Sequence, residues 1–158
     1  MDNNEIRIGI ADFNIALSPG VLVTVGLGSC IGITLFDKIH CIGGLAHIML
    51  PDSTQFNNVT NPLKFADLAI PILIDEMISH GATKSALKAK IAGGASMFNF
   101  SDKSMTMDIG NRNSISVKAT LKKFCIPLVS EDVGGNKGRT IFLNTTSGMV
   151  IIKTVGLD

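Results

Sequence analysis

A stretch without any charged side chain, residues 13–36, constrains the fold more than any other part of the chain. It is long enough to cross a bilayer as a helix. However, Pro19 and Gly20 interrupt it, three further glycines follow by position 32, and the segments between them are rich in β-branched residues. Such segments between turn residues are typical of buried strands. The sequence therefore predicts strands joined by turns here, and not a membrane helix.

The composition favours one globular domain over residues 1–158. A chain of 158 residues, 46% of them hydrophobic, lies in the usual size range of a domain and can bury a core. The 14 basic and 13 acidic residues are mixed along the chain, so no charged patch indicates nucleic acid or an anionic membrane. The N-terminus does not resemble a secretory signal. We expect a cytoplasmic protein that neither inserts into membranes nor binds nucleic acid.

The spacing of apolar residues predicts many strands and two main helices. Strands are expected at residues 6–10, 21–25, 31–36, 41–49, 87–91, 126–130, 140–144 and 149–155, the first few forming a meander. One helix is expected from Asn61-Pro62 to His80, and a second with Asn113 as its N-cap. Helical spacing in the first directs an apolar stripe toward the core, formed by Leu63, Ala66, Ile70, Leu73 and Met77. This order predicts a layered α/β (α+β) sandwich in which strand-rich mixed sheets are covered by the two helices.

The three cysteines, Cys30, Cys41 and Cys125, form an odd set without C-x-x-C spacing. This pattern fits neither a disulfide framework nor a zinc ribbon, so reduced thiols are expected. Only Cys30 lies in a glycine-rich loop, residues 26–30. Such a loop exposes a thiol and allows the backbone N–H groups of Ser29 and Cys30 to converge on an oxyanion.

Cys30 is therefore the candidate nucleophile, although its position alone fits a small buried hydrophobe better. A nucleophilic thiol needs a partly exposed setting that lowers its pKa, and we expect both features at Cys30. Cys41, within a predicted apolar strand, and Cys125, at a predicted helix end, are expected to be small buried hydrophobes.

His47 is the candidate general base because it interrupts an apolar run at residues 42–50. A buried imidazole needs a polar partner, and a satisfied core histidine is the alternative interpretation. A hairpin between adjacent predicted strands would bring His47 and Cys30 face to face. Thr24, in the strand before Cys30, could orient the imidazole or could be an ordinary strand former.

Other kinds of site fit the sequence less well. The glycines before Cys30 lack the spacing of a dinucleotide fingerprint, and the strand predicted after Cys30 excludes the helix that a nucleophile elbow requires. A zinc site would draw its ligands from Cys30, His40, Cys41 and His47. These residues lack the tightly paired spacing of structural zinc sites. His40 is expected to be solvated in a turn and His80 to lie at a helix C-terminus. No metal or cofactor is expected.

Six short blocks spread over the chain carry a family resemblance. They are residues 23–30 (VTVGLGSC), 46–53 (AHIMLPDS), 64–67 (KFAD), 91–97 (IAGGASM), 109–113 (IGNRN) and 131–136 (EDVGGN). Together they resemble the signature of CheD, the chemoreceptor glutamine deamidase family, over nearly the whole chain.

This resemblance implies a compact α/β sandwich with a Cys-His-Thr triad that hydrolyses glutamine side-chain amides on the cytoplasmic helices of chemoreceptors. Matched residue by residue, the triad is Cys30, His47 and Thr24. The resemblance also implies a partner, the CheY-phosphate phosphatase CheC, which family members bind and activate. A mainly non-enzymatic adaptor that binds CheC is the alternative function.

A second candidate surface is the apolar run at residues 97–100, followed by Met105 and Met107. It shows neither helical nor strand periodicity. Met-rich and aromatic surface outside a regular element is often a docking site, although a loop folded over the core fits equally well. Phe98 and Phe100 are the candidate partner-binding residues.

Overall fold

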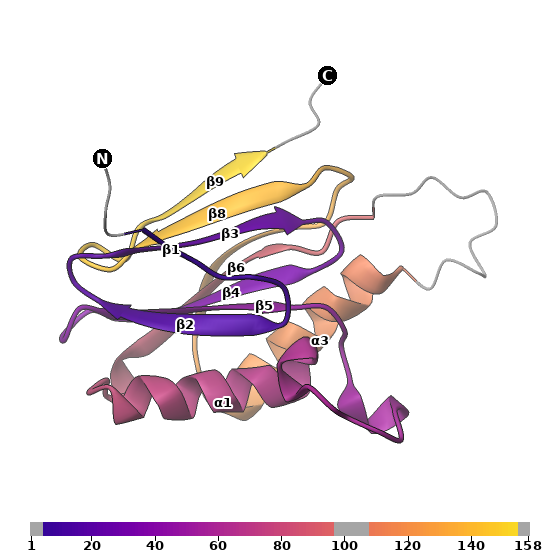
Figure 1. Cartoon of the computed structure of the whole chain (residues 1–158), viewed down its shortest axis with the longest axis horizontal. Coiled ribbons are helices and arrows are strands. Elements are labelled where there is room, and N and C mark those ends of the chain that lie inside the picture. Colours follow the sequence, from indigo (N-terminus) through magenta and orange to yellow (C-terminus); the bar gives the residue numbers. More distant parts are fainter. Residues whose placement is uncertain (1–4, 97–107, 155–158) are drawn as a thin grey trace.

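Three layers make up the fold in this computed structural model, which describes residues 5–96 and 108–154 (Figure 1). The strands of the described part are β1 (Glu5–Arg7), β2 (Asp12–Leu17), β3 (Val21–Leu27), β4 (Ile31–Asp37), β5 (Ile42–Ile48), β6 (Leu87–Gly93), β7 (Leu128–Val133), β8 (Arg139–Asn144) and β9 (Val150–Thr154). The helices are α1 (Ala66–Ser79) and α3 (Ile109–Lys123), with short 3-10 helices at Ser53–Gln55, Pro62–Lys64 and Lys84–Ala86.

The strands divide into two mixed sheets. The four-stranded sheet has the order β1-β3-β8-β9, and the five-stranded sheet has the order β2-β5-β4-β6-β7. The β1–β3 and β6–β7 pairs are parallel, and the other pairs are antiparallel. The five-stranded sheet is the central layer, with α1 and α3 on one face and the four-stranded sheet on the other (Figure 1). The predicted sandwich of mixed sheets and two covering helices is confirmed.

Each interface between layers has its own apolar cluster, because successive side chains of a central strand face opposite sides of the sheet. In β4, Ile31, Ile33 and Leu35 belong to the cluster shared with the helices. In β5, Leu45 packs instead with Leu22 of the four-stranded sheet. A polar residue on this second face therefore lies between two sheets, away from the helices.

The first predicted helix begins slightly later than its cap suggested. Asn61 is an N-cap, accepting from the N–H of Leu63, but it caps a 3-10 turn, and α1 itself begins at Ala66. The apolar stripe predicted for this helix is confirmed. Its buried members include Ala66, Ile70, Leu73 and Met77.

Asn113 is not the N-cap of the second helix, so that prediction is wrong. The cap is Asp108, whose side chain accepts from the N–H of Asn111. Asn113 lies inside α3 on the same buried stripe as Val117 and Leu121. The cap preference of asparagine is overridden here because the Asn113 amide finds backbone partners outside the helix.

The predicted meander of the first strands is also wrong. β2 was not predicted, and it pairs with β5. β3 belongs to the four-stranded sheet, whereas β4 pairs with β5 and β6 in the central sheet. The glycine-rich loop between β3 and β4 therefore carries the chain from one sheet to the other.

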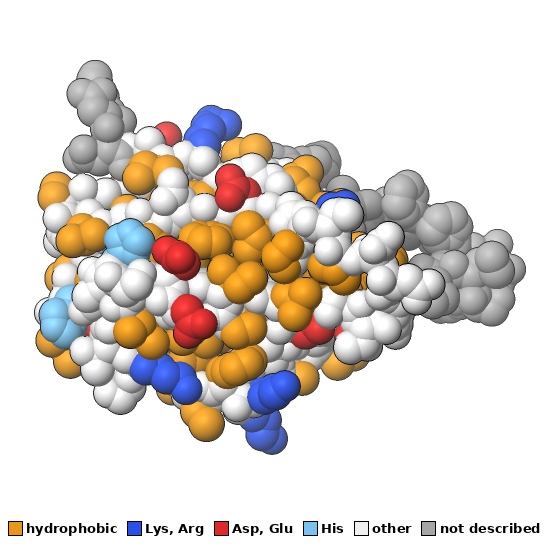
Figure 2. Space-filling model, turned by 60° about the horizontal axis from the view of Figure 1, so that its bottom comes forward, with side chains coloured by type: hydrophobic (Ala, Val, Ile, Leu, Met, Phe, Trp, Pro, Cys, Tyr) orange, Lys and Arg blue, Asp and Glu red, His pale blue; other side chains and the backbone are white. Residues whose placement is uncertain are grey.

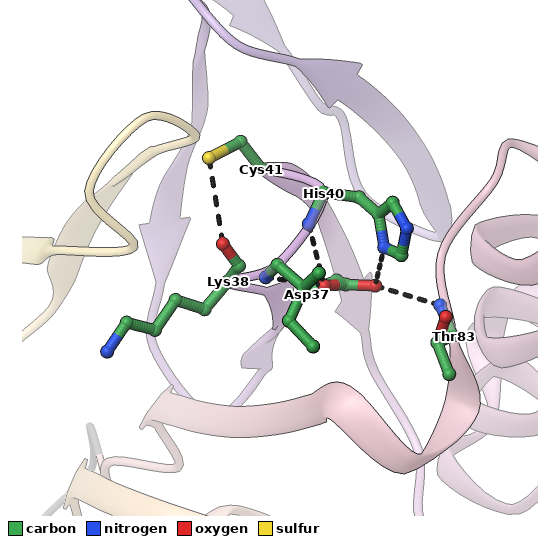
Figure 3. A network of polar contacts seen from close by, with 6 residues as sticks. Asp37, Lys38, His40, Cys41 and Thr83 are labelled. Atoms are coloured by element: carbon green, nitrogen blue, oxygen red, sulfur yellow. Dashed lines mark hydrogen bonds and ion pairs between the residues drawn. The ribbon is translucent and has the colours of Figure 1, made fainter.

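A buried carboxylate organises the far end of β4, at the turn into β5 (Figure 3). The Asp37 side chain accepts from the N–H groups of Ile39, His40 and Thr83 at 2.8–3.0 Å and contacts His40 Nδ1 at 2.9 Å. Burial acts to raise the pKa of Asp37, but these hydrogen bonds outweigh it and the pKa is lowered. Asp37 thereby anchors the turn to the segment that follows α1.

The face that carries the helices exposes hydrophobic side chains among acidic and basic ones (Figure 2). Ile78 of α1 and Ile115 of α3 are 41% and 59% exposed. Within the described ranges, neither helix has the length and apolar content needed to cross a membrane.

Candidate active site

Thr24 and His47 are in contact although they belong to different sheets. Thr24 Oγ1 of β3 lies 2.7 Å from His47 Nδ1 of β5. Both side chains are 1% exposed. Two of the candidate residues predicted from the sequence are therefore brought together in the interface between the sheets.

The backbone carbonyl of Ile8 determines the hydrogen-bonding roles in this contact. Thr24 Oγ1 donates to Ile8 O at 2.7 Å, and a hydroxyl has only one hydrogen to donate. Thr24 must therefore accept from His47 Nδ1–H, which leaves the lone pair on Nε2. Nε2 is buried without a hydrogen-bond partner among the described residues. His47 is thus held as a neutral base with a free lone pair.

Cys30 lies on the same face of the central sheet as His47. It directly precedes β4, in which Gly32 is paired with His47. Cys30 and Gly32 share a face because side chains alternate, and Gly32 places no side chain between the thiol and the imidazole. A Cβ at Gly32 would lie 2.7 Å from Ile141 Cδ1 of β8, so this face meets the four-stranded sheet. The hairpin predicted between the two segments is confirmed as β4–β5.

The Cys30 loop is held against the end of β6 by two glycines. The N–H of Gly94 donates to Cys30 O at 2.9 Å. At Gly93, where φ is +121°, a Cβ would lie 2.1 Å from Cys30 O, so only glycine fits. In the described part of the chain, the N–H groups of Ser29 and Cys30 have no backbone acceptor. Both N–H groups are therefore available to a ligand oxygen.

Burial controls the protonation of the thiol and the imidazole. It raises the pKa of the Cys30 thiol, and the N–H of Cys30 itself offsets only part of this effect. Burial also lowers the pKa of His47 to about 4. The expected lowering of the thiol pKa is therefore wrong for the resting protein, because no charged partner among the described residues offsets the desolvation. The pair rests as neutral thiol and neutral imidazole.

The other two cysteines do not fully match their predicted environments. Cys125 is exposed directly after α3, so the prediction that it is buried is wrong. Cys41 is half-buried in the β4–β5 turn with φ of +53°, one residue before the strand that was predicted to contain it. Its Sγ is directed at the carbonyl of Lys38, 3.8 Å away (Figure 3).

The other two histidines have the structural settings that the sequence predicted. His40 is exposed in the β4–β5 turn beside Asp37, and His80 is the C-cap of α1 with Nδ1 2.8 Å from Glu76 O. The four residues considered for zinc are all described, and they do not form a group of metal ligands.

Two hollows lie on either side of α3. One of about 280 Å³ is lined by residues that include Gly94 and Ser114, and one of about 240 Å³ by residues that include Pro51 and Arg112. The exposed Ile115 lines both. Because the N–H of Gly94 is hydrogen-bonded to the Cys30 carbonyl, the hollow that Gly94 lines adjoins the candidate nucleophile loop.

Two groups in this geometry were missed by sequence reasoning, and two predicted residues cannot be placed. The carbonyl of Ile8 leaves no signal in a side-chain pattern. Asn113 did leave one, since it occupies the apolar stripe of α3. Phe98 and Phe100, the candidate partner-binding residues, lie outside the described residues.

Comparison with known proteins places this chain in a family. The model of the family described as "CheD chemotactic sensory transduction" matches residues 49–154. A protein of Clostridium novyi (strain NT) named "Probable chemoreceptor glutamine deamidase CheD" is 70% identical over 157 residues, which cover 99% of this chain and 97% of that relative. Proteins of the same name from Clostridium botulinum, strains Hall and Okra, are 68% identical with the same coverage. These similarities extend over the Thr24–His47 segment as well, and the chain belongs to the CheD family.

Proposed function

We propose that this protein hydrolyses glutamine side chains on the cytoplasmic helices of chemoreceptors to glutamate, with Cys30 as nucleophile. The observation that carries the proposal is the hydrogen-bond chain from Ile8 O through Thr24 to His47, which leaves Nε2 free on the face that Cys30 shares. The substrate class comes from the relatives, which are named as chemoreceptor glutamine deamidases.

In the first half of the reaction, the Cys30 thiol gives its proton to His47 Nε2 as the sulfur attacks the amide carbon. The electron pair of the carbonyl moves to its oxygen, and the N–H groups of Ser29 and Cys30 stabilise the oxyanion. When this intermediate collapses, the C–N bond breaks and His47 protonates the departing ammonia. A thioester between Cys30 and the substrate remains.

In the second half, water hydrolyses the thioester. His47 Nε2 takes a proton from the water as its oxygen attacks the thioester carbon, and the same oxyanion donors act again. The C–S bond then breaks, the sulfur recovers its proton and glutamate is released. Thr24 keeps the imidazole in the Nδ1–H tautomer throughout, so that Nε2 is always the atom that exchanges protons.

The neutral resting pair suits this sequence of steps. A thiol with a raised pKa is protected from adventitious oxidation and alkylation, because the thiolate is the reactive form. His47 Nε2, on the face that Cys30 shares, supplies the base only when an amide carbon is present to receive the sulfur. Proton transfer and attack then occur together.

The alternative function, an adaptor that mainly binds a CheC-type phosphatase, is less well supported. A buried nitrogen without a partner costs about 1–3 kcal/mol, and a protein that only binds other proteins gains nothing from it. Binding of CheC is compatible with the proposed activity. We propose it as a second property of the same cytoplasmic protein, without metal or cofactor.

The proposal is tested by incubating the protein with a chemoreceptor cytoplasmic fragment and measuring the mass of its tryptic peptides. We expect the amide-to-acid mass shift at a small number of glutamines, together with release of ammonia. Cys125→Ala should behave like the wild type, because Cys125 is exposed and remote from the sheet interface. Absence of any shift with wild-type protein, while CheC binding persists, would establish the adaptor function instead.

A further inference from the structure

Asn113 connects the two segments that carry the candidate nucleophile and base. Its side chain is fully buried in α3, and Nδ2 donates to Ser29 O at 2.9 Å and to Met49 O at 3.0 Å. Ser29 immediately precedes Cys30, and Met49 follows His47 by two residues. Both partners are carbonyls, so the nitrogen must face them and the orientation of the amide is unambiguous.

These two hydrogen bonds lie at the point where the β4–β5 ladder opens. The last paired residues are Ile31 and Ile48. Beyond them β5 departs, because the N–H of Met49 donates to Lys64 O instead of to the Cys30 segment. Asn113 bridges this opening with both hydrogens of its amide. It therefore sets the spacing between the two segments where no strand pairing does so.

The bond to Ser29 also orients a candidate oxyanion donor. Ser29 C=O and Cys30 N–H belong to one planar trans peptide group, in which they point in opposite directions. When Asn113 holds the carbonyl toward α3, the N–H must point away from α3. This N–H has no backbone acceptor in the described residues and lies beside the sulfur of its own residue.

The oxygen of the amide shows that packing alone does not explain why an asparagine occupies position 113. Asn113 Oδ1 is buried without a hydrogen-bond partner among the described residues. A leucine, which has the same branched shape, would avoid the unpaired oxygen, and Val117 and Leu121 on the same stripe are apolar. The amide is retained at a cost in stability, so its two donated hydrogen bonds have a use.

We propose that Asn113 is a positioning residue that locks the Ser29–Cys30 peptide with its N–H directed into the oxyanion site. This inference rests on the proposed hydrolysis and assigns to α3 a part in it. Asn113 itself does not touch the substrate, because its amide is fully buried. Loss of the lock lets the peptide rotate, so that a carbonyl replaces a donor where the oxyanion forms.

The test compares Asn113→Leu with Ser116→Ala, a matched control on the same helix that also removes a hydrogen bond to a backbone carbonyl, Ser116 Oγ to Pro51 O at 2.6 Å. We expect Asn113→Leu to lower kcat for glutamine hydrolysis roughly 10- to 100-fold with KM nearly unchanged. Ser116→Ala should keep kcat within about twofold of the wild type. Equal kcat values for Asn113→Leu and Ser116→Ala would overturn the proposal.

Asn113→Asp provides a second readout that also decides the matter if Asn113→Leu does not fold. A buried carboxyl has a raised pKa, and once protonated it can donate one of the two hydrogen bonds. The ratio of its kcat to that of the wild type should therefore increase as the pH is lowered from about 8 to about 5. A ratio independent of pH would contradict the positioning role.

Alkylation of Cys30 separates this inference from the proposed function. Iodoacetamide labelling, followed by peptide mass analysis, should proceed at a different rate in Asn113→Leu and Asn113→Asp than in the wild type, because the loop carrying the thiol is released. If the wild type deamidates no receptor fragment but the labelling rates differ, Asn113 positions the loop and the proposed reaction is wrong. If the wild type is active and neither labelling nor kcat changes, the positioning role is wrong.

Discussion

The hydroxyl of Thr24 and the imidazole of His47 meet 2.7 Å apart across the interface between two β-sheets, and neither sheet alone could form the contact. The same hydroxyl donates to the carbonyl of Ile8, which makes it an acceptor toward His47. The tautomer of His47 is therefore a consequence of how the two sheets pack.

Replacing this hydroxyl should impair both catalysis and stability. Thr24→Val keeps the volume but leaves His47 Nδ1–H and Ile8 O without their partner. We expect kcat to fall roughly 10- to 100-fold and the free energy of unfolding to fall by about 1–3 kcal/mol. Thr24→Ser, which retains the hydroxyl, should recover most of the activity. The measurements are ammonia release and urea denaturation, and equal activity of the two variants would exclude an orienting role.

Removing the proposed nucleophile, Cys30, or the proposed base, His47, should abolish glutamine hydrolysis. Cys30→Ala and His47→Ala are each expected to reduce the rate to background, since a covalent nucleophile or its base has no substitute in the site. Circular dichroism should show the fold unchanged. Turnover near the wild-type value in either variant would show that the chemistry lies elsewhere.

Stability should depend on pH through His47. Its pKa is about 4 in the folded protein, against an ordinary value of 6.5 in the unfolded chain. Between these values the unfolded chain binds a proton that the folded state does not, so the free energy of unfolding falls as the pH drops from 6.5 toward 4. The full loss is roughly 3 kcal/mol.

This dependence is measured by urea denaturation at a series of pH values for the wild type and His47→Gln. The variant has no group that titrates at this position. The free energy of unfolding of the wild type, minus that of His47→Gln, should therefore fall steadily as the pH drops from 6.5 toward 4. Parallel curves would mean that the pKa of His47 is not lowered in the folded state.

Iodoacetamide should label the exposed Cys125 before Cys30 at neutral pH. The exposed thiol of lowered pKa that the sequence predicts at Cys30 would react in the reverse order, but burial raises the pKa of Cys30 and limits access to its sulfur. The labelling rate of Cys30 should continue to rise at pH values above the ordinary range of a free thiol. Rapid labelling of Cys30 near pH 7 would instead indicate a thiolate–imidazolium pair.

Partner binding remains a prediction based on the sequence of residues 97–107. If Phe98 and Phe100 form a docking surface, Phe98→Ala or Phe100→Ala should weaken binding to CheC or a receptor helix by about 1–3 kcal/mol with little change in Tm. Titration calorimetry and a thermal melt distinguish the possibilities. A lower Tm with unchanged affinity would show that these residues belong to the core.

Local patterns predicted most elements of the fold, but not how distant strands pair. Alternation identified β4, β5 and β6, and helical spacing identified the buried stripe of α1. The separation of β3 from β4 into different sheets was missed, because the turn residues of the intervening loop do not record which strands lie beside each other. The residues of a segment determine locally whether it forms a strand. Which strands pair with it depends on how its two faces are buried in the whole fold.

In the candidate site too, local features could be predicted from the sequence and long-range contacts could not. Cys30 and His47 could be selected because each interrupts its surroundings, one with a thiol in a glycine loop and one with an imidazole in an apolar strand. Their joint placement follows from a hairpin, which is a local structure. The sequence predicts a helix cap at Asn113 because the true partners of its amide, the carbonyls of Ser29 and Met49, are far away in sequence.

Because Thr24 and His47 belong to different sheets, activity depends on the register with which the two sheets pack against each other. A slip of β3 by one residue would turn the side chain of Val23 or Val25 toward His47 in place of the hydroxyl. Such a slip leaves α1 and α3, on the far face of the central sheet, untouched. On warming, enzyme activity should therefore disappear before the helical signal in circular dichroism does. The temperature at which the protein stops working would then be set by the interface between the sheets and not by its helices.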